Sequence, residues 1–371
     1  MEFAVPALKV PEVSYSAIAL ELSSILTAYS QADEFSGVVL LRQGDQDLLK
    51  AAYGYANRTW GLRNQPDTRF RIASISKVFT ATAILQLIER GQLDWNTAVV
   101  QPLGLKDTQI PEAVTVYHLL TMTAGIADWF EESGDWAEDW AALCREHPLY
   151  LLRRNADYLP LFATKPPGSA VGERYQYNNA SYILLGQLIE QVTGLSYFDY
   201  VRRHIFTPAQ MTQSDFVALD AIHPPVAEGY IPVLNEQAAA AWQKNIYAVT
   251  PEAAADGGAV STVDDLSRFV RSLLAGQLLS PKMTQAMLTP QVLEATDDDY
   301  LWHYGFGNQF LLNRAGQVLR WGHTGEEEGV SCRLYYYPQA DLQVVILGNQ
   351  SECAGPLGWE IHDLLAATFK P

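Results

Sequence analysis

The order of the predicted elements indicates an α/β fold of the α+β type, in which helices flank an antiparallel sheet beside a mainly helical domain. Two strand-like runs near the N-terminus, 35–42 and 48–55, flank a turn at Gln43-Gly44-Asp45 and predict a hairpin. Four further strand-like runs come late in the chain, whereas helical patterns dominate residues 94–245. We therefore expect one sheet assembled from both ends of the chain, with the helical block inserted between its halves.

Each remaining element follows from its own local pattern. Apolar residues at helical spacing predict helices, and turn residues bound the strand-like runs. The further predicted helices span 16–29, 115–120, 181–193, 261–275 and 358–369, and the late strands span 304–312, 317–322, 330–337 and 343–347. This order predicts an α/β domain of residues 1–70 and 250–371 and a mainly helical domain of residues 71–249, with any active site between them.

One more helix differs from the others because it is apolar nearly all round. Residues 78–88 contain no charged side chain, and Gly91 follows as a C′ glycine. Such a helix is buried between layers. Ser74 and Lys77 lie three residues apart at its N-terminal end, so both project from one face. Burying a lysine at the start of such a helix costs free energy, which indicates that the residue has a function.

The composition restricts the class of partner. The chain has 371 residues, of which 48% are hydrophobic and 18% charged, and acidic residues outnumber Lys and Arg 42 to 25. The formal net charge of −17 argues against nucleic acid and against an anionic membrane surface, and mainly favours solubility. Three cysteines without a CxxC pair support neither a zinc ribbon nor a disulfide framework.

No sequence feature indicates a membrane segment or a secretory leader. No apolar run approaches the roughly 18 residues that span a bilayer, and the N-terminal residues lack a basic region followed by a long apolar one. We therefore expect a cytoplasmic protein, with a periplasmic or secreted one as the alternative if a native leader was removed.

Several common catalytic and cofactor motifs are missing. The chain has no G-x-S-x-G elbow, no H-E-x-x-H and no P-loop, and Gly305-Phe306-Gly307 lacks the third glycine of a dinucleotide fingerprint. We expect no metal and no cofactor, which leaves the side chains to supply the chemistry.

Ser74 and Lys77 are suited to the roles of a nucleophile and its base. A serine hydroxyl is a poor nucleophile without a nearby base, and a lysine serves as one when desolvation or a cationic neighbour lowers its pKa. The helix N-terminus adds a positive end, and the Ser74 N–H can form one side of an oxyanion hole. The alternative is structural, an N-cap serine followed by a lysine that extends to solvent.

Two later elements contain residues suited to the same chemistry. Tyr177 and Asn179 precede the helix predicted over 181–193, where a tyrosine beside an ammonium can carry a proton and an asparagine can orient a substrate amide. Tyr55-Ala56-Asn57 matches the same pattern but falls in a predicted strand far upstream, so we discount it. His323-Thr324-Gly325, which links two predicted strands, would let a substrate lie along a strand edge and point polar groups into the site.

The segment 127–154 combines tryptophans with many acidic residues. It contains Trp129, Trp136 and Trp140. One interpretation is an exposed acidic helix, and the other is an aromatic-lined lid over a cleft.

Together, Ser74-x-x-Lys77, Tyr177-x-Asn179 and His323-Thr324-Gly325 resemble, in this order, the motifs of the penicillin-recognising serine hydrolases. The resemblance is strongest to the branch with class C β-lactamases, D-alanyl-D-alanine carboxypeptidases and related esterases, and extends over roughly residues 35–347. It implies a β-lactamase/transpeptidase-like fold. The implied roles are Ser74 as acylated nucleophile, Lys77 and Tyr177 as general base and acid, Asn179, His323, Thr324 and Gly325 in substrate binding, and the Glu326 N–H as second oxyanion donor.

The third motif departs from the best-known relatives, which carry a lysine where this chain has His323. An unperturbed histidine, with a pKa near 6.5, is only partly charged at neutral pH, and Glu326, Glu327 and Glu328 follow it. A substrate carboxylate is therefore disfavoured.

We accordingly expect a serine hydrolase that forms an acyl-enzyme on a small-molecule ester or amide or a peptide, and that is more esterase- or peptidase-like than an efficient β-lactamase. One alternative is a β-lactamase or D-alanyl-D-alanine carboxypeptidase acting on cell-wall peptides. The second alternative is a penicillin-binding or sensor protein that is acylated without turnover.

Overall fold

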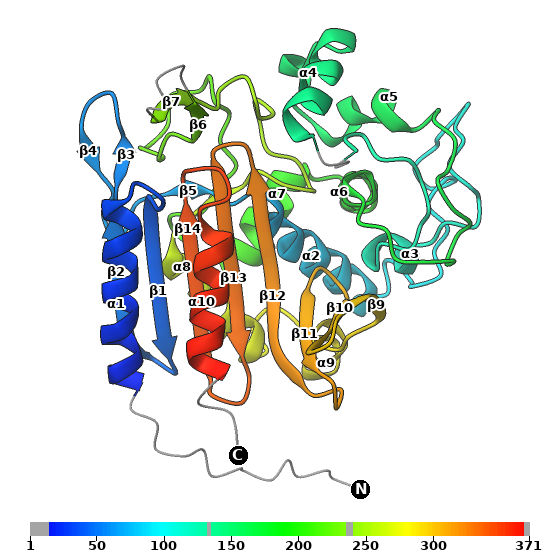
Figure 1. Cartoon of the computed structure of the whole chain (residues 1–371). Coiled ribbons are helices and arrows are strands. Elements are labelled where there is room, and N and C mark those ends of the chain that lie inside the picture. Colours follow the sequence, from blue (N-terminus) through cyan, green and yellow to red (C-terminus); the bar gives the residue numbers. More distant parts are fainter. Residues whose placement is uncertain (1–14, 132–134, 235–239, 367–371) are drawn as a thin grey trace, which may run out of the picture.

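An eight-stranded antiparallel sheet runs through the molecule (Figure 1). The computed structural model describes residues 15–131, 135–234 and 240–366. Both ends of the chain contribute to the sheet, because β1 lies between β2 and β14, so the predicted antiparallel α+β class is confirmed. In order across the sheet, the strands are β2 (Gln46–Tyr53), β1 (Gly37–Gln43), β14 (Leu342–Gly348), β13 (Val330–Tyr337), β12 (Val318–Glu327), β11 (Gln309–Asn313), β10 (Tyr300–Tyr304) and β9 (Val292–Thr296).

Helices cover both faces of the sheet. Side chains alternate across a strand, so Val38 and Leu40 of β1 face one core, whereas Val39 and Leu41 face the other. The helices α1 (Tyr15–Gln31) and α10 (Ala354–Ala366) pack on the second face and lie in front of the sheet in Figure 1. Because both faces are covered, β13 and β14 are buried along their whole length.

The remaining helices either form the helical part of the chain or, like α8 (Val263–Leu274), pack on the sheet, and short two-stranded ladders complete the fold. Helices in this group are α2 (Lys77–Glu89), α3 (Val116–Leu120), α4 (Trp136–Glu146), α5 (Leu159–Phe162), α6 (Asn179–Thr193), α7 (Tyr197–Val201), α8 and α9 (Pro281–Met287). Short 3₁₀ turns lie at Ala73–Ser76, Leu149–Leu151 and Asn155–Tyr158, and a π turn lies at Arg202–Phe206. The two-stranded ladders are β3 (Tyr55–Asn57) with β4 (Leu62–Arg63), β5 (Phe70–Arg71) with β8 (Val260–Ser261), and β6 (Tyr230–Leu234) with β7 (Ala240–Lys244).

The apolar helix predicted after Ser74 is α2, and it is buried as expected. Every residue from Lys77 to Leu87 is buried. The Phe79 ring meets the rings of Phe206 and Phe269 edge-on, each at 5.1 Å between centroids. Burial on all sides fixes the helix, and with it the position of its first residue.

Two predicted strand boundaries were wrong. The run 304–312 is not one strand, because the chain turns between β10 and β11 and Gly307 has a φ of +70°. A Cβ at Gly307 would lie 2.9 Å from the Lys77 carbonyl oxygen, so the turn packs against the start of α2 and requires glycine. Conversely, β12 continues to Glu327, so His323-Thr324-Gly325 lies within a strand and not in a link.

The other expectations concern membrane segments, metal sites, location and domain boundaries. Among the described residues no helix is both long and apolar enough to cross a bilayer, and no group of three or more potential ligands is placed to hold a metal. The cytoplasmic location and the domain boundaries at residues 70/71 and 249/250 stay predictions. The last three residues of the helix predicted over 358–369 lie outside the described residues, as do residues 1–14.

Candidate active site

Ser74 and Lys77 are brought together where the 3₁₀ turn Ala73–Ser76 joins α2. The Lys77 side chain is fully buried, and its Nζ donates to Ser74 Oγ at 2.9 Å. The same Nζ donates to Asn179 Oδ1 at 2.7 Å and to the backbone carbonyl oxygen of Asp256 at 2.7 Å. Three acceptors from three segments of the chain therefore hold the amine against the serine.

The backbone just before the serine is in an unusual conformation. Ala73 has a φ of +45°, in the left-handed region that non-glycine residues rarely adopt. Its carbonyl oxygen accepts from Ser76 Oγ at 2.7 Å and from the Gly258 N–H at 3.2 Å, and the Ile72 N–H donates to the Ala259 carbonyl at 2.9 Å. These bonds hold the sharp turn that presents Ser74 at the surface of the site.

A buried carboxylate positions Asn179 at the N-terminus of α6. Asp128 accepts hydrogen bonds from the backbone N–H groups of Asn179 at 2.7 Å and Ala180 at 2.8 Å. Asn178 caps the same helix, accepting from the Ser181 N–H at 2.7 Å. A negative charge at a helix N-terminus is favourable. Sequence reasoning missed Asp128, because no local motif distinguishes it from the other acidic residues of the segment.

Tyr177 lies over the same lysine. Its ring centroid is 4.9 Å from Lys77 Nζ, within the range of a cation–π contact. The Tyr177 ring also lies against the rings of His323 at 6.3 Å and Tyr304 at 6.4 Å. The structure thus groups the residues of the first two motifs, while Tyr55 of the discarded match lies in β3.

His323 behaves differently from the prediction. Its side chain is fully buried, with Nδ1 donating to the Thr324 carbonyl oxygen at 2.6 Å and Nε2 at 3.2 Å from Tyr304 Oη. Burial, reinforced by the charge of Lys77, lowers the pKa of His323 to about 3. The expectations that this ring is partly charged at neutral pH and points into the cleft were wrong, because the ring is part of the core behind the site.

The rest of the third motif forms a strand edge facing the serine turn. The partner β11 pairs with β12 only as far as Gly322, so residues 323–327 pair with β13 on one side alone. A Cβ at Gly325 would lie 2.3 Å from the Ile72 carbonyl oxygen, so only glycine allows this approach. The Thr324 N–H donates to Gln309 Oε1 at 3.1 Å. Ser74 and Glu326 line one pocket, as the two expected oxyanion donors require.

That pocket has an aromatic wall and an acidic lining. Its lining also contains Asn179, Gly257 and the residues 248–250, and none of its described lining residues is Lys, Arg or His. Its aromatic residues are Trp129, Phe130, Trp136, Trp140 and Tyr158, and its acidic ones are Asp256, Glu326 and Glu327. In α4 the tryptophans turn toward the pocket, while the Glu138 side chain is 65% exposed. Both interpretations of segment 127–154 therefore hold in part, with residues 132–134 outside the described chain.

The three acidic residues have different partners. Glu326 pairs with Arg333 and Glu327 with Arg71. Asp256, by contrast, makes no ion pair among the described residues, and its Oδ2 accepts from the Trp129 indole at 2.8 Å. Burial raises the pKa of Asp256. Sequence reasoning missed this residue, since its contacts join segments far apart in the chain.

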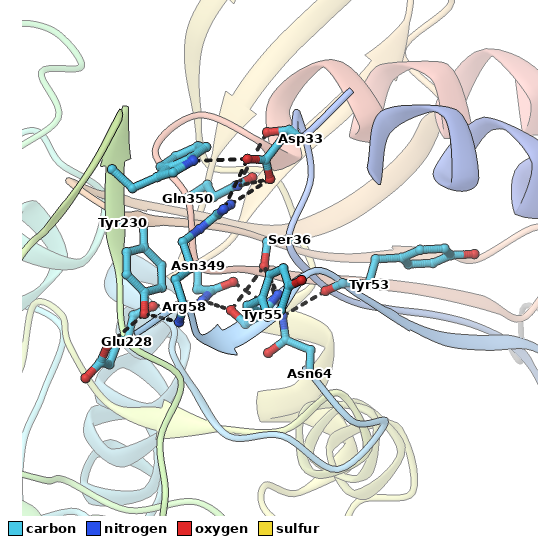
Figure 2. A network of polar contacts seen from close by, with 11 residues as sticks. Asp33, Ser36, Tyr53, Tyr55, Arg58, Asn64, Glu228, Tyr230, Asn349 and Gln350 are labelled. Carbon is cyan, nitrogen blue, oxygen red and sulfur yellow. Dashed lines mark hydrogen bonds and ion pairs between the residues drawn. The ribbon is translucent and has the colours of Figure 1, made fainter. Parts of the chain in front are cut away.

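A polar network joins the β6–β7 ladder to Asp33 and Arg58 near the N-terminal part of the chain (Figure 2). The Arg58 guanidinium donates to Asp33 at 2.7 and 3.1 Å and lies 4.0 Å from the Trp242 ring centroid of β7. The Arg58 N–H also donates to Tyr230 Oη of β6 at 2.6 Å. The pocket residues 248–250 follow the end of β7 at Lys244 after three intervening residues, so this network holds the strand that leads to one pocket wall.

A buried lysine bonded to a serine, beneath a tyrosine and between an antiparallel sheet and a helical block, defines a penicillin-recognising serine hydrolase. The chain belongs to the beta-lactamase family, whose model matches residues 22–365, and it has the β-lactamase/transpeptidase-like fold.

Three similar proteins agree with this family assignment. The crystal structure of a penicillin-binding protein from Bacillus halodurans matches with a TM-score of 0.83 and 34% identity, over 92% of this chain and 99% of the other. Penicillin-binding protein 4 of Amycolatopsis lactamdurans is 27% identical over 325 residues, covering 82% of this chain and 78% of that protein. Teichoic acid D-alanine hydrolase of Staphylococcus aureus is 24% identical over 292 residues, covering 77% and 66%.

Proposed function

We propose that this protein is an esterase or amidase that acylates Ser74 and then hydrolyses the acyl-enzyme. The observation that carries the proposal is the 2.9 Å contact between Lys77 Nζ and Ser74 Oγ. Ser74 and Glu326, whose N–H groups are the expected oxyanion donors, both line the pocket at this contact. A serine activated by an adjacent base is the arrangement that nucleophilic acyl transfer needs.

The steps follow from the neighbours of Ser74. Neutral Lys77 takes the Ser74 proton as Oγ adds to the carbonyl carbon, and the N–H groups of Ser74 and Glu326 stabilise the oxyanion. Collapse of the tetrahedral intermediate breaks the bond to the leaving group, which receives a proton through Tyr177 and Lys77. Water, deprotonated by the same pair, then attacks the acyl carbon and releases the acid with regeneration of Ser74. Asn179 orients both the lysine and the substrate.

The charges around the pocket favour neutral or cationic substrates over carboxylates. A β-lactam or a D-alanyl terminus carries a free carboxylate, for which a fixed cation is the natural partner. His323 is neutral because its pKa is lowered to about 3, and Asp256, Glu326 and Glu327 line the pocket. The similarity to a teichoic acid D-alanine hydrolase supports a hydrolytic activity, whereas the penicillin-binding relatives favour the alternative.

A panel of three substrates tests the proposal: a p-nitrophenyl ester, nitrocefin and a D-amino-acid peptide, with mass spectrometry of the protein. We expect turnover of the ester, an acyl adduct on Ser74, and a loss of at least about 1,000-fold in kcat/KM for Ser74→Ala. Ester turnover that survives in Ser74→Ala would exclude the mechanism. A kcat/KM for nitrocefin within about 10⁴–10⁸ M⁻¹s⁻¹ would instead support a β-lactamase. A stable adduct without turnover would support a sensor.

A further inference from the structure

The pocket beside Ser74 contains two buried polar groups, a carboxyl group that accepts one hydrogen bond and an indole N–H that makes none among the described residues. Asp256 is 6% exposed, and among the described residues it makes no ion pair. The indole Nε1 of Trp136 is buried and has no hydrogen-bond partner in the described part of the chain. Buried polar groups without partners are costly. An occupant that carries charge or polar atoms would therefore fit this pocket better than a hydrocarbon.

The aromatic side chains that line the pocket contact one another at steep angles. Phe130 meets Trp136 at 4.9 Å with an angle of 65° between rings, and it meets Trp140 at 5.6 Å and 75°. Trp129 meets Tyr158 at 5.1 Å and 74°. Rings at such steep angles form adjoining walls and not a stack. An enclosure of aromatic rings attracts a cation through the negative faces of the rings, most strongly when the cation is desolvated.

The charged side chains around the pocket also favour a cationic ligand. Arg333 and Arg71 already pair with Glu326 and Glu327, so the acidic side chain available to a ligand is that of Asp256. Burial raises the pKa of Asp256, and a cation bound beside it would favour its ionised form. Lys77 donates to the backbone carbonyl of Asp256, which leaves its carboxylate to the Trp129 indole and to the pocket.

We infer that the substrate places a cationic ammonium group in this aromatic pocket, where Asp256 and the rings of Trp129, Trp136 and Trp140 bind it. This inference rests on the proposed hydrolase function and specifies its substrate class. It assigns Asp256 and the tryptophans to specificity and leaves the acyl-transfer steps at Ser74 unchanged.

Binding of matched small molecules tests the inference independently of catalysis. We would measure the affinity of choline and of its neutral isostere 3,3-dimethylbutan-1-ol by calorimetry. Choline is expected to bind at least about tenfold more tightly, and the ratio of the two affinities should approach one in Asp256→Asn. Trp136→Leu should lower the same ratio, and it provides a second test if Asp256→Asn fails to fold. The matched control is Glu138→Gln, which removes an equal charge from the solvent side of α4 and should keep the ratio.

Three results would overturn the inference: no detectable binding of choline, equal or tighter binding of the neutral alcohol, or an equal loss of the affinity ratio in Glu138→Gln.

A second pair of probes links the result to turnover, namely the p-nitrophenyl esters of 4-(trimethylammonio)butanoate and of 5,5-dimethylhexanoate. We expect the cationic ester to have a kcat/KM at least about tenfold higher. Ser74-dependent turnover without this preference overturns only the present inference, whereas loss of Ser74 dependence for both esters overturns the proposed function itself.

Discussion

The three contacts of Lys77 suit both protonation states that acyl transfer needs. A lysine ammonium has three donors, and here they meet Ser74 Oγ, Asn179 Oδ1 and the Asp256 carbonyl oxygen. A neutral amine keeps two donors and one lone pair. If the two donors stay on Asn179 and on the carbonyl, the lone pair points at Ser74. The proton can therefore move between Ser74 and Lys77 without reorientation of the side chain.

Tyr177 provides the first test at the level of single residues. Removing its hydroxyl in Tyr177→Phe keeps the ring over Lys77 and removes the proton carrier. We expect kcat/KM for a p-nitrophenyl ester to fall about 100-fold or more, the usual contribution of general acid–base catalysis. The melting temperature should change little.

Tyr55→Phe is the matched control for this experiment. Tyr55 belongs to the second Y-x-N sequence but lies in β3 and does not line the pocket. Its replacement should leave kcat/KM within a factor of about two of wild type, well below the effect of a general acid–base residue. Equal effects of the two substitutions would contradict a catalytic role for Tyr177.

At the level of elements, the distance between β12 and the serine turn would set the geometry of the proposed oxyanion hole. Gly325 lies against the chain just before Ser74, and a Cβ there would come within 2.3 Å of the Ile72 carbonyl oxygen and 3.3 Å of the Ala73 Cβ. Both contacts involve groups that cannot turn away, so an alanine would force the strand and the turn apart. The two proposed oxyanion donors, the N–H groups of Ser74 and Glu326, lie on these two elements.

We therefore expect Gly325→Ala to reduce kcat/KM about 100-fold, because a displacement near 1 Å is enough to disrupt catalytic positioning. Steady-state kinetics and thermal unfolding would separate this loss of activity from a general loss of stability. Gly168→Ala is the matched control, since a Cβ there meets only Gln176 side-chain atoms at 3.6 and 3.7 Å. If Gly325→Ala kept wild-type activity, β12 would not hold an oxyanion donor.

The sequence predicted those elements whose pattern is local. The α2 helix, its end at Gly91 and the hairpin of β1 and β2 follow from apolar periodicity and turn residues, and the structure contains them. The break between β10 and β11 was missed, because Gly307 turns in response to packing against Lys77 and Ala81 of α2. These residues lie 230 and 226 positions earlier in the chain, outside any local window.

The same distinction separates the predicted site residues from the missed ones. Ser74, Lys77, Tyr177 and Asn179 stand in short motifs, and the structure brings them together. Asp256 contacts Lys77 and Trp129, which are distant from it in sequence, so no local pattern identifies it as a site residue. The neutral state of His323 likewise depends on its burial among residues distant in sequence.

At the level of the whole molecule, two buried histidines couple stability to pH. His362 is 1% exposed, with its ring stacked on Tyr337 at 5.9 Å, and burial together with the charge of Arg320 lowers its pKa to about 3. His323 has a pKa lowered to a similar value. An unfolded chain binds a proton at each histidine near pH 6.5. Between pH 6.5 and 3 the unfolded state therefore holds protons that the folded state lacks, so stability falls as pH falls through this range.

Replacing His362 should remove part of this dependence. Each buried histidine lowers the free energy of unfolding by about 1.4 kcal/mol per pH unit below 6.5, or by about 2 kcal/mol at pH 5. Urea unfolding of His362→Phe at pH 7 and pH 5 should thus show a loss of stability on acidification that is about 2 kcal/mol smaller than in wild type. The partly exposed His223 supplies the control, because His223→Phe should lose as much stability between pH 7 and pH 5 as the wild type does. If His362→Phe lost as much as wild type, the buried ring would have to be protonated in the folded protein, and the packing of α10 on the sheet would need to accommodate a charge.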